Sequence, residues 1–177
     1  KEYRRQRQMC IRDSFNIKGA KEHAIALDTL QQAERFHQKL HNAILRAQTQ
    51  ADEITPGQLE VVIVGAGATG VELAAELHKA TREMTAYGLD KINPDRDISI
   101  SLIEASDRLL PALPLRMSQS VESELRKLNV NLFMGERVTE VNAKGIMTHK
   151  DRYIDSALVV WAAGIKAPGF LQKLGLT

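Results

Sequence analysis

The sequence has one cysteine, few aromatic residues and no long apolar run. The single Cys10 cannot form a disulfide within the chain, and such cysteine usage fits a reducing compartment. No apolar stretch approaches the roughly 20 residues that a helix needs to cross a bilayer. The formal net charge of +2 is too small to indicate binding to nucleic acid. We therefore expect an ordinary globular chain with no nucleic-acid partner.

The first fourteen residues, KEYRRQRQMCIRDS, differ in composition from the rest of the chain. They are basic and polar, as is typical of a disordered leader. The peptide MCIRDS is also what ATG-TGT-ATA-AGA-GAC-AGY encodes, and that string is a common sequencing-adapter end. We therefore expect residues 1–14 to be a non-native or disordered leader. The chain starts without Met and stops after FLQKLGLT, so we expect it to be a fragment.

Residues 15–58 are expected to precede the main domain. EHAIALD indicates a short strand, and Thr29 and Gln32 have the spacing of a capping box. Apolar residues then recur at three- and four-residue steps, which predicts an amphipathic helix to about residue 49. The polar segment TQADEITPGQ contains Pro56 and Gly57. It predicts a linker with a domain boundary.

From residue 59 onward, predicted strands and helices alternate. Continuous apolar runs and stripes predict a strand, a helix, a strand, a helix and a strand, at 59–64, 68–86, 98–104, 115–128 and 129–134. RVTEVNAKGIMTHKDRYIDS indicates antiparallel strands, and ALVVWAAG indicates a returning buried strand. The fold class is therefore α/β, a Rossmann-like domain with a parallel sheet and a β-hairpin excursion.

A glycine-rich turn joins the first of these strands to its helix. Gly65 permits the tight turn, Gly67 lets the backbone approach a pyrophosphate, and Gly70 lets the helix pack closely on the strand. The helix begins at Ala68 and Thr69, where free N–H groups attract an anion. A tight turn with no ligand is the alternative.

Two carboxylates accompany this turn. Glu104 ends the second strand, where an acidic residue accepts hydrogen bonds from ribose hydroxyls. Its charge would repel a 2′-phosphate and favour NADH over NADPH, although Arg108 nearby could weaken that preference. Glu72 lies in the first turn of the helix, where the helix dipole stabilises it with or without a function. A solvated strand-end residue is the alternative for Glu104.

Small residues end the last predicted strand. Ala163 and Gly164 leave room for a flat ring, whereas Trp161 is expected to belong to the core. The five histidines have no metal-ligand spacing with acidic residues or with the cysteine, so no metal site is expected.

Three segments resemble the NADH-binding domain of type II, non-proton-pumping NADH:quinone oxidoreductases, which belong to the pyridine nucleotide-disulfide oxidoreductase-like flavoproteins. These segments are VVIVGAGATGVELAAELH, SLIEASDRLLPALP and VVWAAGIKAP. FNIKGAKEHAIALDTLQQAERFH resembles the stretch that precedes that domain. The resemblance implies that residues 15–58 end the FAD-domain region and that residues 59–177 are the NADH-binding domain, truncated at its end.

The resemblance also implies cofactors and roles. NADH would pass a hydride to FAD, whose site lies mostly outside this fragment, and electrons would then reach a membrane quinone. Glu72 would position nicotinamide against flavin or relay a proton, and Glu104 would bind the adenosine ribose. The other implied cofactor-binding residues are Gly65, Gly67, Ala68, Thr69, Gly70, Ala163 and Gly164.

The whole protein would be a peripheral protein on the cytoplasmic side of the bacterial inner membrane, and a homodimer is compatible with it. Three alternatives stay open. One is another flavin-linked reductase of the ferredoxin, nitrite or sulfide:quinone type. Another is a non-catalytic NADH-sensing module. The third, an S-adenosylmethionine methyltransferase, would not need the β-hairpin return to a WAAG strand.

Overall fold

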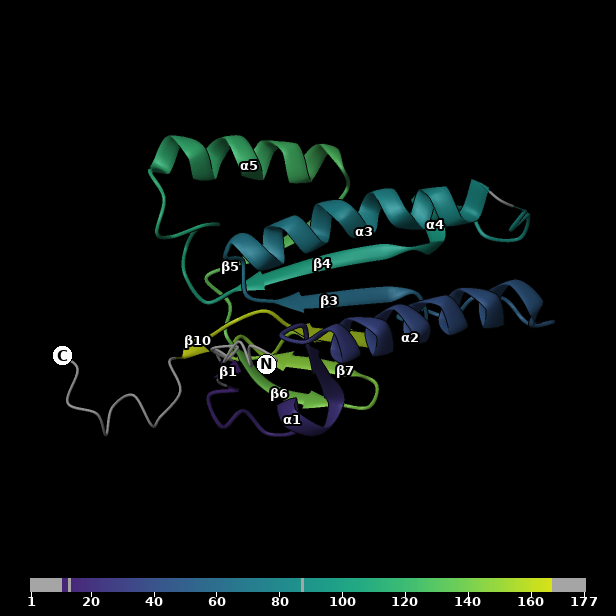
Figure 1. The fold of residues 1–177 in the computed structure, drawn as a ribbon, viewed down its shortest axis with the longest axis horizontal. Helices are drawn as coiled ribbons and strands as arrows, with labels where there is room; N and C mark the ends of the chain where they lie inside the picture. The colour runs from purple at the N-terminus through teal and green to yellow at the C-terminus, as the bar shows by residue number, and fades with distance from the viewer. Residues whose placement is uncertain (1–10, 13, 87, 167–177) are drawn as a thin grey trace, which may run out of the picture.

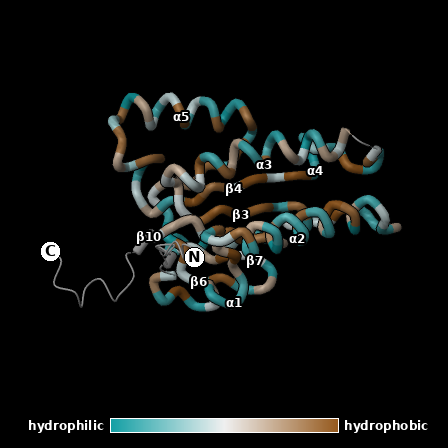
Figure 2. The backbone as a smooth tube through the Cα atoms, in the orientation of Figure 1, coloured by the Kyte–Doolittle hydropathy of each residue, from teal (hydrophilic) through white to brown (hydrophobic). Residues whose placement is uncertain are grey.

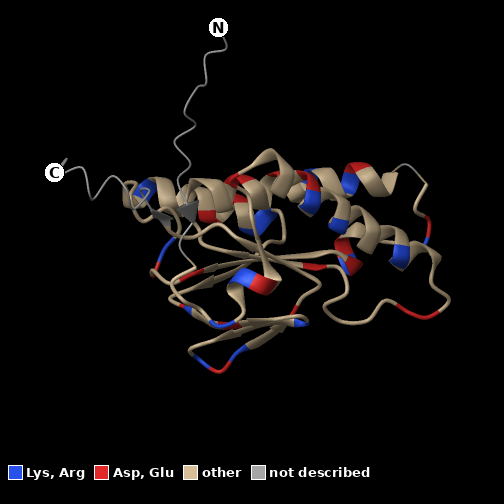
Figure 3. Ribbon diagram, turned by 60° about the horizontal axis from the view of Figure 1, so that its bottom comes forward, with Lys and Arg blue, Asp and Glu red and all other residues tan. Residues whose placement is uncertain are grey.

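The computed structural model describes residues 11–12, 14–86 and 88–166, which form three layers (Figure 1). The longer helices cover one face of a parallel sheet, and a smaller antiparallel sheet lies against the other face (Figure 3). The predictions for residues 1–10 and 167–177 lie outside the described residues. The predicted α/β class with a parallel sheet and an antiparallel excursion is confirmed.

Five parallel strands form the central sheet, in the spatial order β2-β9-β3-β4-β5. Their apolar composition follows from burial on both faces, as expected for a parallel sheet. In chain order they are β2 (Ala24–Ala26), β3 (Glu60–Val64), β4 (Ser99–Glu104), β5 (Asn131–Met134) and β9 (Leu158–Trp161).

The helices are α1 (Ala20–His23), α2 (Leu30–Thr49), α3 (Ala68–Ala86), α4 (Pro94–Asp97) and α5 (Leu115–Lys127). The capping box that opens α2 is confirmed, because the Thr29 side chain accepts from Gln32 and the Gln32 side chain accepts from the Thr29 backbone. None of the helices in the described part of the chain is long and apolar enough to cross a membrane.

The antiparallel layer consists of β6 (Val138–Asn142), β7 (Gly145–Thr148) and β8 (Tyr153–Asp155). Its apolar residues Val141 and Ile146 pack with Val62 and Val64 of β3 and with Trp161 of β9. Separately, β1 (Ile11–Arg12) pairs antiparallel with β10 (Ile165–Lys166). Figure 2 shows that apolar residues are concentrated in the central strands, between the helices and the small sheet.

The segment before residue 59 is part of the same sheet and the same core. β2 pairs with β9, so that Ala24 lies opposite Val159. From α2, Phe36, Leu40, Ile44 and Ala47 are buried in one cluster with residues of β3, β4 and α3. The polar segment expected as a domain boundary connects α2 to β3. The division at residue 58 stays a prediction.

Glu60 lies at the start of β3, at the end of the sheet opposite to the glycine turn. Burial raises the pKa of its carboxyl, and the hydroxyls of Ser101 and Ser99 oppose this shift without cancelling it. Its Oε1 is buried and has no hydrogen-bond partner within the described residues. The backbone is better satisfied there, because Ser156 Oγ donates to the Glu60 carbonyl at 2.9 Å.

The packing of α2 on the sheet predicts a large difference between two neighbouring leucine-sized residues. Ile44 is 1% exposed and Leu45 is 43% exposed. Replacing Ile44 by Ala should lower the free energy of unfolding by about 2–5 kcal/mol, because it leaves a cavity in the core. Leu45→Ala, the matched control, should change it by about 0.5 kcal/mol or less. Urea unfolding measures both, and equal losses would mean that α2 does not pack on the sheet.

Candidate nucleotide-binding site

The glycine turn lies where the carboxyl ends of β3 and β9 meet the start of α3. Gly65 has φ +106°, and a Cβ there would lie 2.6 Å from the Ala163 backbone nitrogen. A Cβ on Gly70 would overlap the Gly65 carbonyl oxygen. Both positions therefore exclude a side chain, as the sequence pattern predicts.

Gly67 lacks a side chain for a different reason. A Cβ built there has no atom of the described residues within 4 Å, so it would point into open space. The first N–H groups of α3 have no partner within the helix, and together they carry a partial positive charge. The turn is therefore an open cradle in which a ligand can approach the backbone at an electropositive helix end.

Glu104 is fixed directly beside this cradle. Its Oε2 accepts from the Ala66 backbone N–H at 2.8 Å, and its Oε1 accepts from the Ser106 N–H at 2.8 Å. The carboxylate thus bridges the glycine turn and the loop that follows β4. Two charge-assisted bonds hold it at the mouth of the site, oriented before any ligand arrives.

A pocket of about 540 Å³ opens at this edge of the sheet, which is within the usual range for nucleotide-sized ligands. It brings together five of the predicted site residues, namely Gly65, Gly67, Glu104, Ala163 and Gly164. Trp161 is buried as expected and also lines the pocket. The carboxyl ends of adjacent parallel strands meet here, which is where open α/β sheets bind ligands.

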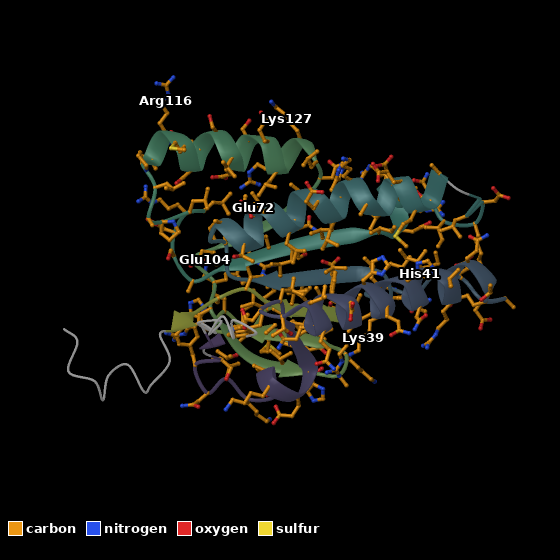
Figure 4. All side chains as sticks on the ribbon, viewed as in Figure 1. Lys39, His41, Glu72, Glu104, Arg116 and Lys127 are labelled. Carbon is orange, nitrogen blue, oxygen red and sulfur yellow. The ribbon has the colours of Figure 1, made fainter. Side chains whose placement is uncertain are left out.

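The remaining predicted residues do not line the pocket. Ala68 and Thr69 begin α3, and Gly70 is buried between α3 and the end of β3. Glu72 is exposed on α3, apart from Glu104 at the end of β4 (Figure 4). Its carboxylate therefore faces outward from the described residues.

Three charged residues around the site were not predicted. Glu136 and Arg137 line the pocket from the turn after β5. Arg152, from the turn between β7 and β8, donates to Glu136. These residues lie in irregular turns, where neither periodicity nor a motif marks them in the sequence.

The charged residues outside the pocket bear on the expectations for Arg108 and for a metal site. Arg108 donates to the Pro111 carbonyl at 2.7 Å within its own loop and is not among the residues that line the pocket. Acidic and basic residues are interspersed along the ribbon in the view of Figure 3. Within the described residues, no group of three or more His, Cys, Asp or Glu could hold a metal ion.

A glycine turn at the carboxyl end of a central parallel strand, beside an acidic residue that ends the next strand, defines a dinucleotide-binding domain of the Rossmann type. The family model described as pyridine nucleotide-disulphide oxidoreductase matches residues 11–177. The chain therefore belongs to this family.

Within this family, the chain is similar to several named oxidoreductases. The type II NADH:quinone oxidoreductase of Haemophilus influenzae is 36% identical, over 91% of this chain and 39% of its own length. The external alternative NAD(P)H-ubiquinone oxidoreductase B2 of Arabidopsis thaliana is 30% identical, over 92% of this chain and 29% of its own. The structure of NDH2 from Plasmodium falciparum in complex with NADH superposes with a TM-score of 0.78 at 25% identity, over 91% of this chain and 34% of that one. The chain thus spans well under half the length of these relatives.

The geometry of the glycine turn predicts different effects on stability for Gly→Ala at two of its positions. Gly70→Ala should lower the free energy of unfolding by about 1–3 kcal/mol, because its methyl group overlaps the Gly65 carbonyl in a packed site. Gly67→Ala should leave it unchanged, or raise it by about 0.4–1 kcal/mol through the less flexible unfolded chain. Thermal and urea unfolding measure both variants. A loss in Gly67→Ala as large as that in Gly70→Ala would refute the open cradle.

Proposed function

We propose that this chain is the NADH-binding part of a type II NADH:quinone oxidoreductase. The observation that carries the proposal is the meeting of the Gly65–Gly67 turn, Glu104 and the Ala163–Gly164 strand end around one pocket. Two relatives that match most of this chain are named as oxidoreductases of NADH or NAD(P)H with quinones.

Different parts of the pocket would bind the pyrophosphate, the adenosine ribose and the nicotinamide of NADH. The pyrophosphate fits the open backbone at Gly67 and the start of α3, because both offer N–H groups to an anion. The Glu104 carboxylate is placed to accept from the adenosine ribose hydroxyls, in exchange for or in addition to its backbone bonds. The nicotinamide then extends toward Ala163 and Gly164, where small residues leave space for its ring.

Hydride transfer needs an acceptor beside the nicotinamide. In the proposed enzyme the acceptor is FAD, which takes up the hydride and passes electrons on to a quinone. The sequence has one Gly-x-Gly-x-x-Gly turn, and it suits NADH, so FAD would be held by other residues of the full-length protein. The work of this chain is to bind NADH and to orient its nicotinamide.

Two finer statements belong to the same proposal. The full-length protein would contact the cytoplasmic side of a bacterial inner membrane to reach its quinone, and a homodimer is compatible with it. Glu72 would face the flavin-binding region, which agrees with its exposure on α3. There it would position nicotinamide against flavin or relay a proton.

The role proposed for Glu104 predicts a change of nucleotide preference. Glu104→Gln should weaken NADH binding at least about tenfold, because charge-assisted hydrogen bonds to the ribose contribute about 1.5–3 kcal/mol each. NADPH should gain relative to NADH, since the charge opposing its 2′-phosphate is gone. Isothermal titration of the chain with both nucleotides measures this.

Asp107→Asn is the matched control, because Asp107 is an exposed acidic residue of the same loop outside the pocket. It should leave the NADH to NADPH affinity ratio unchanged. No NADH binding by the unmodified chain would overturn the proposed function. Binding with a ratio that Glu104→Gln does not move would overturn only the role of Glu104.

The role proposed for Glu72 concerns rate rather than affinity. In the full-length flavin-containing protein, Glu72→Gln should slow flavin reduction by NADH by about 100-fold if positioning is disturbed. Its effect on stability should be small, about 0.3–1 kcal/mol, as for any carboxylate near a helix start.

Stopped-flow absorbance separates flavin reduction from quinone reduction. The control is Glu76→Gln, one turn further along the same helix and also exposed. If both variants reduce flavin and quinone at the unmodified rate, Glu72 serves only the helix dipole.

A further inference from the structure

The turn after β5 forms the wall of the pocket nearest to Glu104. The Glu136 N–H donates to the Glu104 carbonyl at 3.0 Å, and the Gly135 N–H donates to the Ser106 carbonyl at 2.7 Å. Because Glu104 marks the adenosine end of the proposed site, this wall is the surface against which an adenosine group would lie. Its position therefore matters for binding.

The Glu136 carboxylate belongs to this wall and is buried, since the residue is only 5% exposed. It accepts from the Thr148 hydroxyl at 3.0 Å, and both of its oxygens lie 3.2 Å from Arg152 Nε. The Arg152 guanidinium in turn lies over the Phe133 ring, 5.0 Å from its centroid. Thr148 and Arg152 flank the turn between β7 and β8, and the Thr148 N–H donates to the Arg152 carbonyl at 2.9 Å.

The same turn also holds the next residue of the wall. The Arg137 N–H donates to His149 Nδ1 at 3.1 Å, and the His149 N–H donates to the Arg137 carbonyl at 2.9 Å. The turn at residues 148–152 therefore forms hydrogen bonds with two consecutive residues of the wall, Glu136 and Arg137. These bonds involve both side chains and backbone. Arg152 supplies the only charge compensation that these bonds give to Glu136.

We propose that Arg152 is a positioning residue for the adenosine end of the pocket and that it acts through Glu136. This inference rests on the proposed function. Paired with Arg152, the Glu136 carboxylate stays bonded to Thr148 and Arg152. Without that cation, a buried charge is costly to keep, and the carboxylate gains by turning toward water. Glu136 is among the residues that line the pocket, and a carboxylate turned into the pocket would disturb the wall and occupy the place of the adenosine group.

The experiment compares three variants of the whole chain with two halves of the dinucleotide. NADH binding is measured by isothermal titration, and 5′-AMP and nicotinamide mononucleotide binding by NMR titration. Arg152→Met should raise the dissociation constants of NADH and 5′-AMP at least about fivefold, roughly the loss of one hydrogen bond. Nicotinamide mononucleotide should bind as before, because it occupies the other end.

Adding Glu136→Gln to Arg152→Met should recover most of the lost affinity, since no charge is then left to turn into the pocket. Arg126→Met is the matched control, because it breaks an exposed ion pair with Glu122 on α5, away from the pocket. It should change none of the three constants.

The outcomes separate the two proposals. Failure of the unmodified chain to bind NADH would overturn the proposed function. If the unmodified chain binds NADH, unchanged 5′-AMP affinity in Arg152→Met would overturn the positioning role. Equal losses of both halves, or no recovery in the double variant, would also overturn it, because general loosening of the sheet predicts that pattern.

Discussion

The site depends on one close contact between backbone segments. At Gly65 and Gly70 the start of α3, the end of β3 and Ala163 after β9 approach so closely that no Cβ fits between them. This contact sets the helix with its electropositive end at the edge of the sheet, where Gly67 remains uncovered. A side chain at either packed glycine would separate helix from sheet and move the cradle.

Glu104, at the end of β4, is the second element of the site. β3 and β4 pair in parallel register, so that Val64 lies opposite Ile103 and the next residue of β4 is Glu104. The carboxylate is thereby carried to the glycine turn and bonded to Ala66. The hydrogen bonds that orient the Glu104 carboxylate also connect the two loops beside the pocket. The same bonds therefore serve both the site and the fold.

Much of this arrangement is predictable from the sequence, because the relevant signals are local. The glycine turn, the strand before it and the helix after it each have their own pattern, and Glu104 falls where a strand pattern ends. The pairing of β2 with β9 was not predicted, since a three-residue strand carries no mark of a partner near the other end of the chain. Glu136 and Arg152 were missed for the same reason. Their pairing depends on two turns that meet only in the folded protein.

Glu60, at the opposite end of the sheet, makes the free energy of unfolding depend on pH. The pKa of its carboxyl is raised above the ordinary 4.5 by burial, so folding takes up a proton in the interval between the two values. Its contribution to stability is fully present below the ordinary pKa and is lost as the pH rises through the raised one. At higher pH the chain therefore keeps a charged carboxylate where the sheet favours a neutral one. The strand that carries the glycine turn thus begins at a residue that opposes folding at neutral pH, and the apolar pairing of the rest of β3 offsets that opposition.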